Sequence, residues 1–290
     1  MFFNRNLLSL ILSLGVAGTA YATVVPDDEG VEPAATAEEY TEQVADFVLP
    51  DNAPDLESKI TNRVRVDLEL VLLVDVSGSV DPSEYRLQLE GYANAFRDSA
   101  LHEVIESREG VVVSMYMWSA ALEQAHSPWF VLRTAEDCER LATYIDNRMD
   151  QRPFDGKTIM AQAIRRAVVG LERNRFDSDE QIIDISGDGI CENWWYYTNE
   201  GTTAEDPSVP NDRLYGFRWS ESRALAAYTG TIINGISIGK RQGLADWYAE
   251  HVPMGENSFT MHADDFEQFG QAIKLKLLME LQSFLRTSHD

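Results

Sequence analysis

Residues 70–74 form an uninterrupted run of branched aliphatic side chains that leads directly into a cluster of oxygen-bearing ones. A short run that is apolar throughout predicts a strand buried on both faces, as in a parallel sheet. Asp75, Ser77 and Ser79 follow at alternate positions and offer one carboxylate and two hydroxyls. Gly78 is expected to allow a sharp turn that points all three at one centre. The stretch therefore predicts a site for a hard divalent cation at the end of a central strand.

The residues after this loop carry the signals of a helix N-terminus. Asp81 is the expected N-cap, Pro82 occupies the first helical position, and Glu84 completes a capping box. The helix is expected to continue to Asp98. Its apolar residues recur at three-to-four-residue spacing, which predicts that one face packs on the sheet. These residues are Tyr85, Leu89, Tyr92 and Phe96.

Two remote stretches carry the same kind of chemistry. Thr158 ends the sequence Asp-Gly-Lys-Thr and precedes a helix expected over residues 159–171, so its hydroxyl lies at a helix N-terminus. Residues 182–185 predict a second buried strand, and Ser-Gly-Asp188-Gly follows it. The carboxyl ends of the strands in an open α/β sheet form one crevice, where separate loops can meet. Five oxygen ligands are predicted there: Asp75, Ser77, Ser79, Thr158 and Asp188.

The first loop by itself is as typical of an ordinary polar strand-to-helix turn as of a metal site. Together the three segments resemble the metal-ion-dependent adhesion site of the von Willebrand factor A (VWA) domain. Asp75-Val-Ser-Gly-Ser79 resembles the first loop of that family, Thr158 its threonine loop, and Asp188 the aspartate that precedes a glycine. The resemblance covers roughly residues 66–290 and is strongest to a group of secreted bacterial VWA-like proteins without a settled activity.

This resemblance implies a Rossmann-like VWA fold and a bound Mg²⁺, with Mn²⁺ or Ca²⁺ as alternatives. It also implies an adhesion mechanism in which an Asp or Glu carboxylate of a protein partner completes the metal shell. Two alternatives remain open at this stage. The metal could have a structural role, or the site could belong to a metal-dependent hydrolase. Hydrolysis is disfavoured because the loops offer no histidine beside the ligands and no G-x-S-x-G motif.

The rest of the chain alternates strands with helices, which predicts a doubly wound, mostly parallel sheet flanked by helices. One strand, residues 129–132, is expected to run antiparallel at the sheet edge. Further strands are expected at residues 111–118, 231–238 and 258–261, and helices at residues 135–149, 220–228, 244–251 and 264–285. The last helix carries an apolar stripe that comprises Phe266, Phe269, Ile273, Leu277 and Leu278.

A long loop is expected at residues 190–219, directly after the predicted ligand Asp188. It exceeds the ~15 residues that compact domains usually allow, and loops of that kind are commonly functional or disordered. Rigid aromatic rings bury much area at low entropic cost, so its aromatic cluster is a candidate partner-binding surface. An equally weighted alternative is a local cap over the sheet. The cluster consists of Trp194, Trp195, Tyr196 and Tyr197.

Residues 1–22 are typical of a secretory signal peptide, with Arg5 in a basic region, an apolar stretch at residues 7–16 and Ala20-Tyr-Ala22 as the cleavage pattern. The apolar stretch is shorter than the ~20 residues that a spanning helix needs, which disfavours a membrane anchor. Residues 23–65 are acidic and rich in proline, which predicts a flexible linker. We therefore expect a secreted or periplasmic protein with no transmembrane anchor after cleavage.

The composition excludes some partners and restricts the cysteine chemistry. A formal net charge of -24 disfavours nucleic acid as a partner, because phosphate binding needs clustered Lys and Arg. Cys138 and Cys191 are the two cysteines, and they fall in segments expected at different ends of the sheet. A disulfide requires Cα atoms within ~7 Å, so two separate thiols are expected. Neither cysteine has the paired spacing of a zinc site.

Overall fold

The computed structural model describes residues 11–14, 20–23, 62–119, 124–149, 153, 156–191 and 219–287. Most of the predicted linker at residues 23–65 lies outside these ranges. The aromatic cluster Trp194, Trp195, Tyr196 and Tyr197 lies outside them as well. Both therefore stay predictions from the sequence.

The described strands form one sheet in the order β2-β1-β9-β8-β7-β3-β4-β5, and β6 pairs with β4 off this path. Its central strands all run parallel to one another. These are β3 (Val64–Asp75), β4 (Val111–Trp118), β7 (Phe176–Gly187), β8 (Ile232–Ile238) and β9 (Thr260–Ala263). The buried runs 70–74 and 182–185 thus lie side by side in the middle of the sheet, as their unbroken apolar character predicted.

Antiparallel pairing occurs beside β4. The predicted antiparallel strand at residues 129–132 is confirmed as β6 (Phe130–Leu132), which pairs with the first half of β4. A second segment, β5 (Gln124–His126), was not predicted and pairs with the last three residues of β4. At three residues it is too short for a hydrophobic period to be visible in the sequence.

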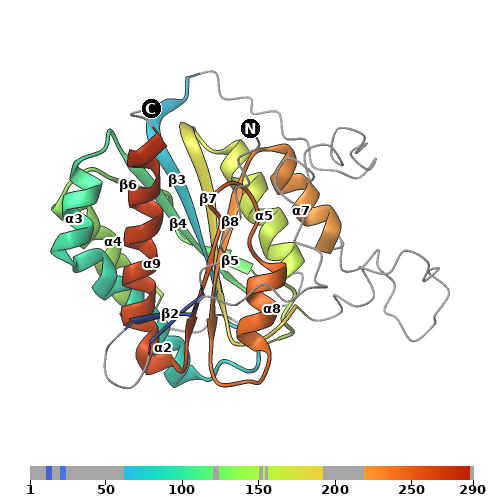
Figure 1. Ribbon diagram of the computed structural model, residues 1–290. Helices are drawn as coiled ribbons and strands as arrows, with labels where there is room; N and C mark the ends of the chain where they lie inside the picture. Colours follow the sequence, from blue (N-terminus) through green and yellow to red (C-terminus); the bar gives the residue numbers. More distant parts are fainter. Residues whose placement is uncertain are drawn as a thin grey trace, which may run out of the picture.

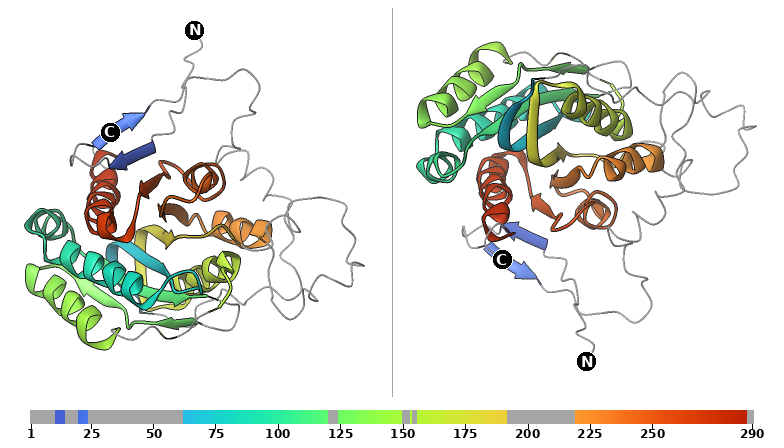
Figure 2. Two further views of the ribbon diagram at one scale, coloured as in Figure 1. Left: turned by 90° about the horizontal axis from the view of Figure 1, so that it is seen from below. Right: turned by 90° about the horizontal axis from the view of Figure 1, so that it is seen from above.

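Helices cover both faces of the sheet (Figures 1 and 2). One face carries α2 (Pro82–Arg97), α3 (Ser99–Glu106), α4 (Ala135–Arg148) and α9 (Phe266–Thr287). The other carries α5 (Met160–Arg173), α7 (Trp219–Tyr228) and α8 (Leu244–His251). Each layer buries its own hydrophobic core against the sheet. The predicted doubly wound, mostly parallel α/β fold is therefore confirmed.

The start of α2 follows the predicted capping box. The Asp81 carboxylate accepts hydrogen bonds from the backbone N–H groups of Ser83 and Glu84, and Glu84 Oε2 accepts one from Asp81 N at 2.8 Å. The sequence did not predict α3 as a separate helix, because a single residue, Asp98, separates it from the end of α2 at Arg97. Asp98 is both the C-cap of α2 and the N-cap of α3, and its carboxylate accepts from Ala100 N at 3.0 Å.

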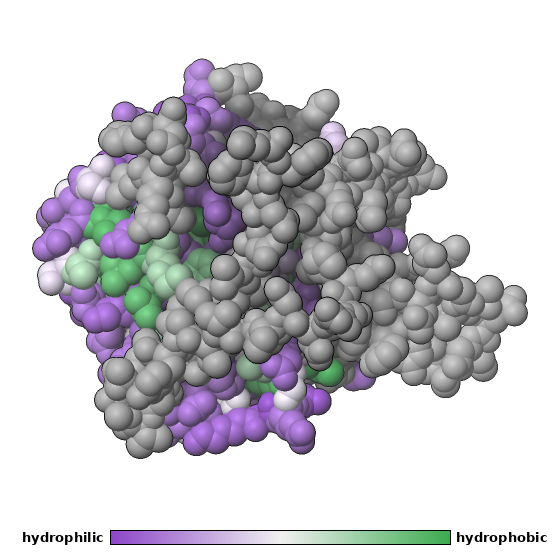
Figure 3. Space-filling view, in the orientation of Figure 1, coloured by the Kyte–Doolittle hydropathy of each residue, from purple (hydrophilic) through white to green (hydrophobic). Residues whose placement is uncertain are grey.

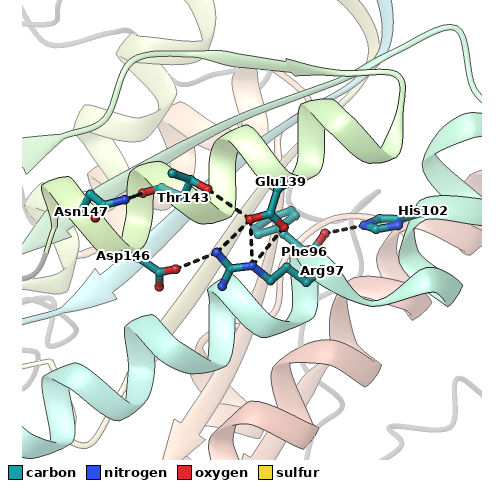
Figure 4. A network of polar contacts seen from close by, with 7 residues as sticks. All are labelled: Phe96, Arg97, His102, Glu139, Thr143, Asp146 and Asn147. Carbon is teal, nitrogen blue, oxygen red and sulfur yellow. Dashed lines mark hydrogen bonds and ion pairs between the residues drawn. The ribbon is translucent and has the colours of Figure 1, made fainter.

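A network of polar contacts joins α2 to α4 on the surface (Figure 4). The Arg97 guanidinium contacts Glu139 at 3.1 Å and Asp146 at 2.7 Å. Thr143 Oγ1 donates to Glu139 Oε1 at 3.1 Å on the same helix. Exposed ion pairs of this kind contribute little to stability because solvent screens them, so the hydrophobic core beneath holds the two helices together.

The hydrophilic character of the chain is visible on its surface. Hydrophilic residues dominate the described part of the face in Figure 3, and an apolar area lies over α3 and α9. Val104, Leu275 and Leu278 are partly buried there and pack against the core. None of the described helices is long and apolar enough to cross a membrane.

The N-terminal segment contributes two short strands at the sheet edge. The backbone of β1 (Ile11–Leu14) runs parallel to β9 and pairs with β2 (Ala20–Thr23) in antiparallel fashion. Both strands overlap the signal peptide predicted at residues 1–22. Cleavage after Ala22 is still a prediction, and it would remove β1 and leave β9 at the edge.

Neither cysteine forms a disulfide, and both are buried. Cys138 lies in the core beneath α2, α4 and α9, whereas Cys191 packs in the core on the opposite face of the sheet. The expectation of two separate thiols is therefore confirmed. Burial raises the pKa of the Cys138 thiol to about 12, which keeps it protonated and unreactive at neutral pH.

Candidate functional site

The five predicted ligand residues come together at the carboxyl end of the central strands. Asp75 is the last residue of β3, and Asp188 follows β7 directly. β3 and β7 are parallel neighbours with Val74 opposite Ser186, so the two strands end at the same level. Thr158 lies two residues before α5, on the chain that returns to this edge. The structure thus brings together all five positions from three separate loops.

A continuous chain of oxygen atoms runs across the three loops. Thr158 Oγ1 donates to Ser77 Oγ at 3.2 Å, and Ser77 Oγ lies 3.3 Å from Ser79 Oγ. Ser79 Oγ in turn donates to Asp188 Oδ1 at 2.7 Å. Asp75 Oδ1 accepts a hydrogen bond from the backbone N–H of Ser77 at 2.8 Å, which fixes the carboxylate beside the hydroxyls.

Backbone hydrogen bonds hold the first loop against the threonine loop. Gly78 N donates to Gly156 O at 2.7 Å, and Ile159 N donates to Ser119 O at 3.3 Å. The sharp turn expected at Gly78 does not use the left-handed region, since Gly78 is not among the residues with positive φ. An added Cβ at Gly78 would lie 3.4 Å from Gly156 O, at the limit of ordinary van der Waals contact, so the two loops pack closely at this position. The close approach of the two loops brings Ser77 next to Thr158.

The glycine before Asp188 is equally constrained. A Cβ at Gly187 would lie 2.7 Å from Tyr248 Oη and 2.8 Å from Asp75 Oδ2, closer than such contacts are found. Tyr248 Oη donates to Gly189 O at 3.4 Å, so this tyrosine packs beneath both acidic loops. Burial raises the pKa of Tyr248 well above 10, and the charges of Asp75 and Asp188 add to the effect. The phenol therefore stays neutral beside them.

The sequence reading missed two residues that support the site. Tyr248 is one of them, and its apolar context gave no signal of a site role. Gln88 is the other: its Nε2 donates to Asp75 O at 3.2 Å, and its Oε1 accepts from Ser186 Oγ at 3.3 Å. Gln88 is fully buried within the apolar stripe of α2. A polar residue in that stripe, one turn before Tyr92, was the signal that could have found it.

The site is buried on one side and open on the other. Asp75, Ser77 and Thr158 are buried, Asp188 is half-buried and Ser79 is exposed. Partial burial raises the pKa of Asp188, while the hydrogen bond from Ser79 and the positive charge of Arg241 oppose that rise. The donor set contains two carboxylates and three neutral hydroxyls. It therefore carries little negative charge for a set of five oxygen donors.

The spacing of these donors is compatible with an octahedral cation. Ligand oxygens ~2.1 Å from a Mg²⁺ ion lie about 3.0 Å from their neighbours in the shell. The three oxygen-to-oxygen contacts of 3.2, 3.3 and 2.7 Å bracket that value. Among the residues that the structure describes, no group of three or more His, Cys, Asp or Glu side chains could hold a metal. A hydroxyl-rich oxygen set suits Mg²⁺ or Mn²⁺ and is unlike a zinc site.

Several solved structures are similar to this chain. The pilus adhesin SpaC from Lactobacillus rhamnosus GG, in its open conformation, has a TM-score of 0.48 and 14% identity, over 76% of this chain and 31% of SpaC. The von Willebrand factor type A protein from Catenulispora acidiphila has a TM-score of 0.44 and 11% identity, over 74% of this chain and 43% of that one. The vWF domain of the type V pili tip protein Mfa5 from Porphyromonas gingivalis has a TM-score of 0.43 and 12% identity, over 74% and 97%.

The chain thus spans about a third of SpaC, and similarities at this level say nothing of what it binds. No curated protein matches the sequence. A family model does match, over residues 65–209 and 210–285, and its description is that of a protein of unknown function. These two segments cover well over half of the chain and contain all five residues of the site, so the chain belongs to the DUF1194 family.

Proposed function

We propose that this protein is a secreted, adhesion-type binding module that depends on a divalent cation. Asp75, Ser77, Ser79, Thr158 and Asp188 would hold Mg²⁺, and a carboxylate of a protein partner would complete the metal shell. The observation that carries this proposal is the chain of oxygen contacts from Thr158 through Ser77 and Ser79 to Asp188, which joins three loops. The fold of the sheet does not by itself require these oxygen-bearing side chains from three loops to lie so close together.

The donor set favours a metal that binds an outside ligand. Two carboxylates balance the charge of a divalent ion, and the hydroxyls add none, so the ion stays electrophilic. Mg²⁺ usually retains waters and exchanges them for hard oxygen donors such as carboxylates. The exposed position of Ser79 places one side of the site toward solvent, where a partner can reach it.

A hydrolase is the less favoured alternative. Ser237 Oγ lies 2.8 Å from His262 Nδ1, and His262 Nε2 lies 3.5 Å from Asp264 Oδ1, which superficially resembles a catalytic triad. However, Ser237 is fully buried, so a substrate carbonyl cannot reach its hydroxyl. Lys157 beside Thr158 supplies positive charge at the site without providing a nucleophile–base pair. These features support a binding role for the site over a hydrolytic one.

Calorimetric titration with Mg²⁺ and Mn²⁺ tests the metal part of the proposal. Wild-type protein should bind one ion, and Thr158→Val should bind it more weakly. Thr143→Val is the matched control, because Thr143 is an exposed threonine on α4 outside the site. Unchanged binding in Thr158→Val, or no binding in the wild type, would show that the site holds no cation.

The partner part is tested with extracellular proteins whose carboxylates are intact or blocked by amidation. The module should capture a partner only with Mg²⁺ present and with the carboxylates free. Capture that survives both Asp188→Ala and amidation would assign the metal a structural role and favour the aromatic cluster at residues 194–197 as the binding surface. Loss of capture when only the carboxylates of the partner are amidated, with Mg²⁺ still present, would show that the module recognises carboxylates and does not simply adsorb proteins.

A further inference from the structure

A buried charged cluster links α9 to the central sheet on the face that carries α2. Lys276 and Asp184 are each 0% exposed, and Glu280 is 1% exposed. Lys276 Nζ lies 2.6 Å from Asp184 Oδ1 on β7 and 2.5 Å from Glu280 Oε1, one turn further along α9. The sequence did not predict this charged cluster. The predicted stripe of α9 contained apolar residues only, whereas two further buried positions of the helix, Lys276 and Glu280, are charged.

The walls of the cluster exclude water and fix its members. Asn234 Nδ2 donates to Glu280 Oε1 at 2.8 Å, and Asn234 Oδ1 accepts from Phe259 N at 2.9 Å. Lys276 Nζ lies 5.1 Å from the centroid of the Phe259 ring. The side chains therefore have little freedom to change their relative positions.

The cluster is electrostatically unfavourable in its ionic form. Two carboxylates face one ammonium group, and removing ions from water costs several kcal/mol each in a protein interior. Neither oxygen of Asp184 accepts a hydrogen bond from the part of the chain that the structure describes, although Lys276 Nζ is close. A carboxylate this buried normally accepts several hydrogen bonds. The lack of hydrogen bonds to Asp184 from the described residues therefore needs an explanation.

Glu280 has the acidity of a proton-transfer group. Burial raises its pKa from 4.5 to about 7, the negative charge of Asp184 adds to this effect, and Lys276 opposes it. A carboxyl group with a pKa near neutrality can both accept and donate a proton under physiological conditions.

We propose that Lys276 and Asp184 become joined by an intramolecular amide bond, with Glu280 transferring the protons. Glu280 Oε1 takes a proton from the Lys276 ammonium, and the neutral Nζ attacks Cγ of Asp184. The N–C bond forms and one C–O bond breaks. That oxygen leaves as water with two of the three ammonium protons, one of which Glu280 returns. An ammonium and a carboxylate thus give an amide and one water, without an oxidant or a co-reactant.

Two physical terms drive this condensation. Well-oriented groups held in one molecule react with effective molarities of about 10⁵–10⁸ M, which lowers the barrier to the attack of Nζ on Cγ. The reaction also removes one buried positive and one buried negative charge. The resulting amide needs no redox partner, in a chain whose two cysteines are unbridged.

The bond would fasten α9 to the strand that ends at the candidate metal site. It would join residues 184 and 276, which are 92 positions apart, and the loop between them contains α7, β8, α8 and β9. A cross-link over such a loop restricts the unfolded chain and resists unfolding. The inference is independent of the proposed metal binding, because the cluster shares no residue with the five oxygen donors.

Mass spectrometry of the purified full chain tests the proposal. The intact mass should be lower than the mass calculated for the same termini by the mass of one water. A denatured tryptic digest should contain a branched peptide that joins residues 176–213 to residues 275–286, with no cleavage after Lys276. Lys276→Arg and Glu280→Gln should both show the full mass, since a guanidinium is not a nucleophile and an amide cannot shuttle the proton.

Lys274→Arg is the matched control, because Lys274 lies two residues away and makes a surface ion pair with Asp98. It should lose one water like the wild type. A wild-type chain at full mass, cleaved after Lys276, would show that the cluster is ionic and would overturn the proposal whether or not the variants fold. A branched peptide through Asn234, formed with loss of ammonia, would overturn the assignment to Asp184.

Discussion

The hydroxyl oxygens of Ser77 and Thr158 lie 3.2 Å apart, although the two residues are separated by 81 positions in the chain. Their approach is fixed by the backbone hydrogen bond from Gly78 N to Gly156 O at 2.7 Å. The loop after β3 and the loop before α5 are therefore held together so that the two hydroxyl groups lie side by side. This relationship is the structural basis of the metal-binding proposal, and it makes each hydroxyl separately testable.

Replacing either hydroxyl should weaken metal binding without unfolding the protein. Ser77→Ala and Thr158→Val each remove one oxygen donor and keep the side-chain volume close to the original. We expect Mg²⁺ affinity to fall by about 10–100-fold in each variant, comparable to the loss of other groups that build a metal site. Titration calorimetry measures this directly, and Thr143→Val should leave the affinity unchanged.

Adding one methyl group at Gly187 should disturb the site more than adding one elsewhere. In Gly187→Ala the Cβ would meet Tyr248 Oη at 2.7 Å and Asp75 Oδ2 at 2.8 Å. Overpacking of this kind costs about 1–3 kcal/mol, so the free energy of unfolding should fall and Asp75 should move. Gly270→Ala is the control, because its Cβ would lie at an ordinary distance of 3.5 Å from Gly91 Cα on α2.

Urea unfolding of both glycine variants provides the comparison. Introducing Tyr248→Phe into Gly187→Ala should recover part of the lost stability, since the Oη atom is then gone. Equal stability of Gly187→Ala and the wild type would mean that the two loops are packed more loosely than the structure shows.

Glu280 should make the stability of the protein depend on pH. Its pKa is raised from 4.5 to about 7 by burial and by Asp184, so the folded chain holds a proton that the unfolded chain releases in this range. Its contribution to the free energy of unfolding is therefore fully present below pH 4.5 and is lost as the pH rises through about 7. While they are ionic, Asp184 adds to this effect and Lys276 opposes it without reversing its sign. Burial is the largest cause and acts in the same direction once an amide joins the two side chains.

The measurement is the slope of the free energy of unfolding against pH between 4.5 and 7, in the wild type and in Glu280→Gln. The glutamine cannot titrate, so the wild type should lose more stability over this interval than the variant does. Parallel slopes would show that folding does not raise the pKa of Glu280.

The capping box ahead of α2 should contribute to stability independently of the metal. Asp81→Ala removes the acceptor of two backbone N–H groups and should lower the free energy of unfolding by about 0.5–2 kcal/mol. Asp81→Asn keeps an oxygen at the same place and should cost less. Chemical denaturation in EDTA separates this effect from any change at the site, and equal losses in both variants would contradict the capping role.

Export should remove the first 22 residues. A chain produced with its N-terminal segment in a bacterial host should be recovered outside the cytoplasm with Thr23 as its first residue, as the Ala-x-Ala pattern predicts. Mass spectrometry of the N-terminal peptide gives the answer. A recovered chain that retains residues 11–14 would instead keep β1 beside β9.

The sequence was sufficient to predict that the five candidate ligand residues lie together, because strand ends are easy to recognise. Apolar runs that stop at Asp75 and just before Asp188 mark where two parallel strands finish, and the topology then brings their loops together. The supporting residues Gln88 and Tyr248 are different. Their roles depend on which helix packs against which loop, and no local pattern encodes that packing.

The burial of the charged cluster on α9 could not be predicted from the sequence either. Lys276 lies beside the apolar stripe of α9 in the sequence. Lysine is almost never fully buried unless it is paired, so a solvent-exposed position is predicted for it. It is instead fully buried because Asp184 on β7 and Glu280 on its own helix lie within reach. A polar position within the apolar strand at residue 184 was the visible signal, and only the packing of α9 gave it a partner.

Anomalous diffraction from crystals soaked in Mn²⁺ tests the central claim most directly. The account predicts one strong manganese peak between Ser77, Ser79 and Thr158, close enough for their hydroxyl oxygens to coordinate it and with Asp75 and Asp188 beside it. Saturated crystals with no peak at this position, or with manganese bound elsewhere while these five side chains keep their mutual hydrogen bonds, would contradict it.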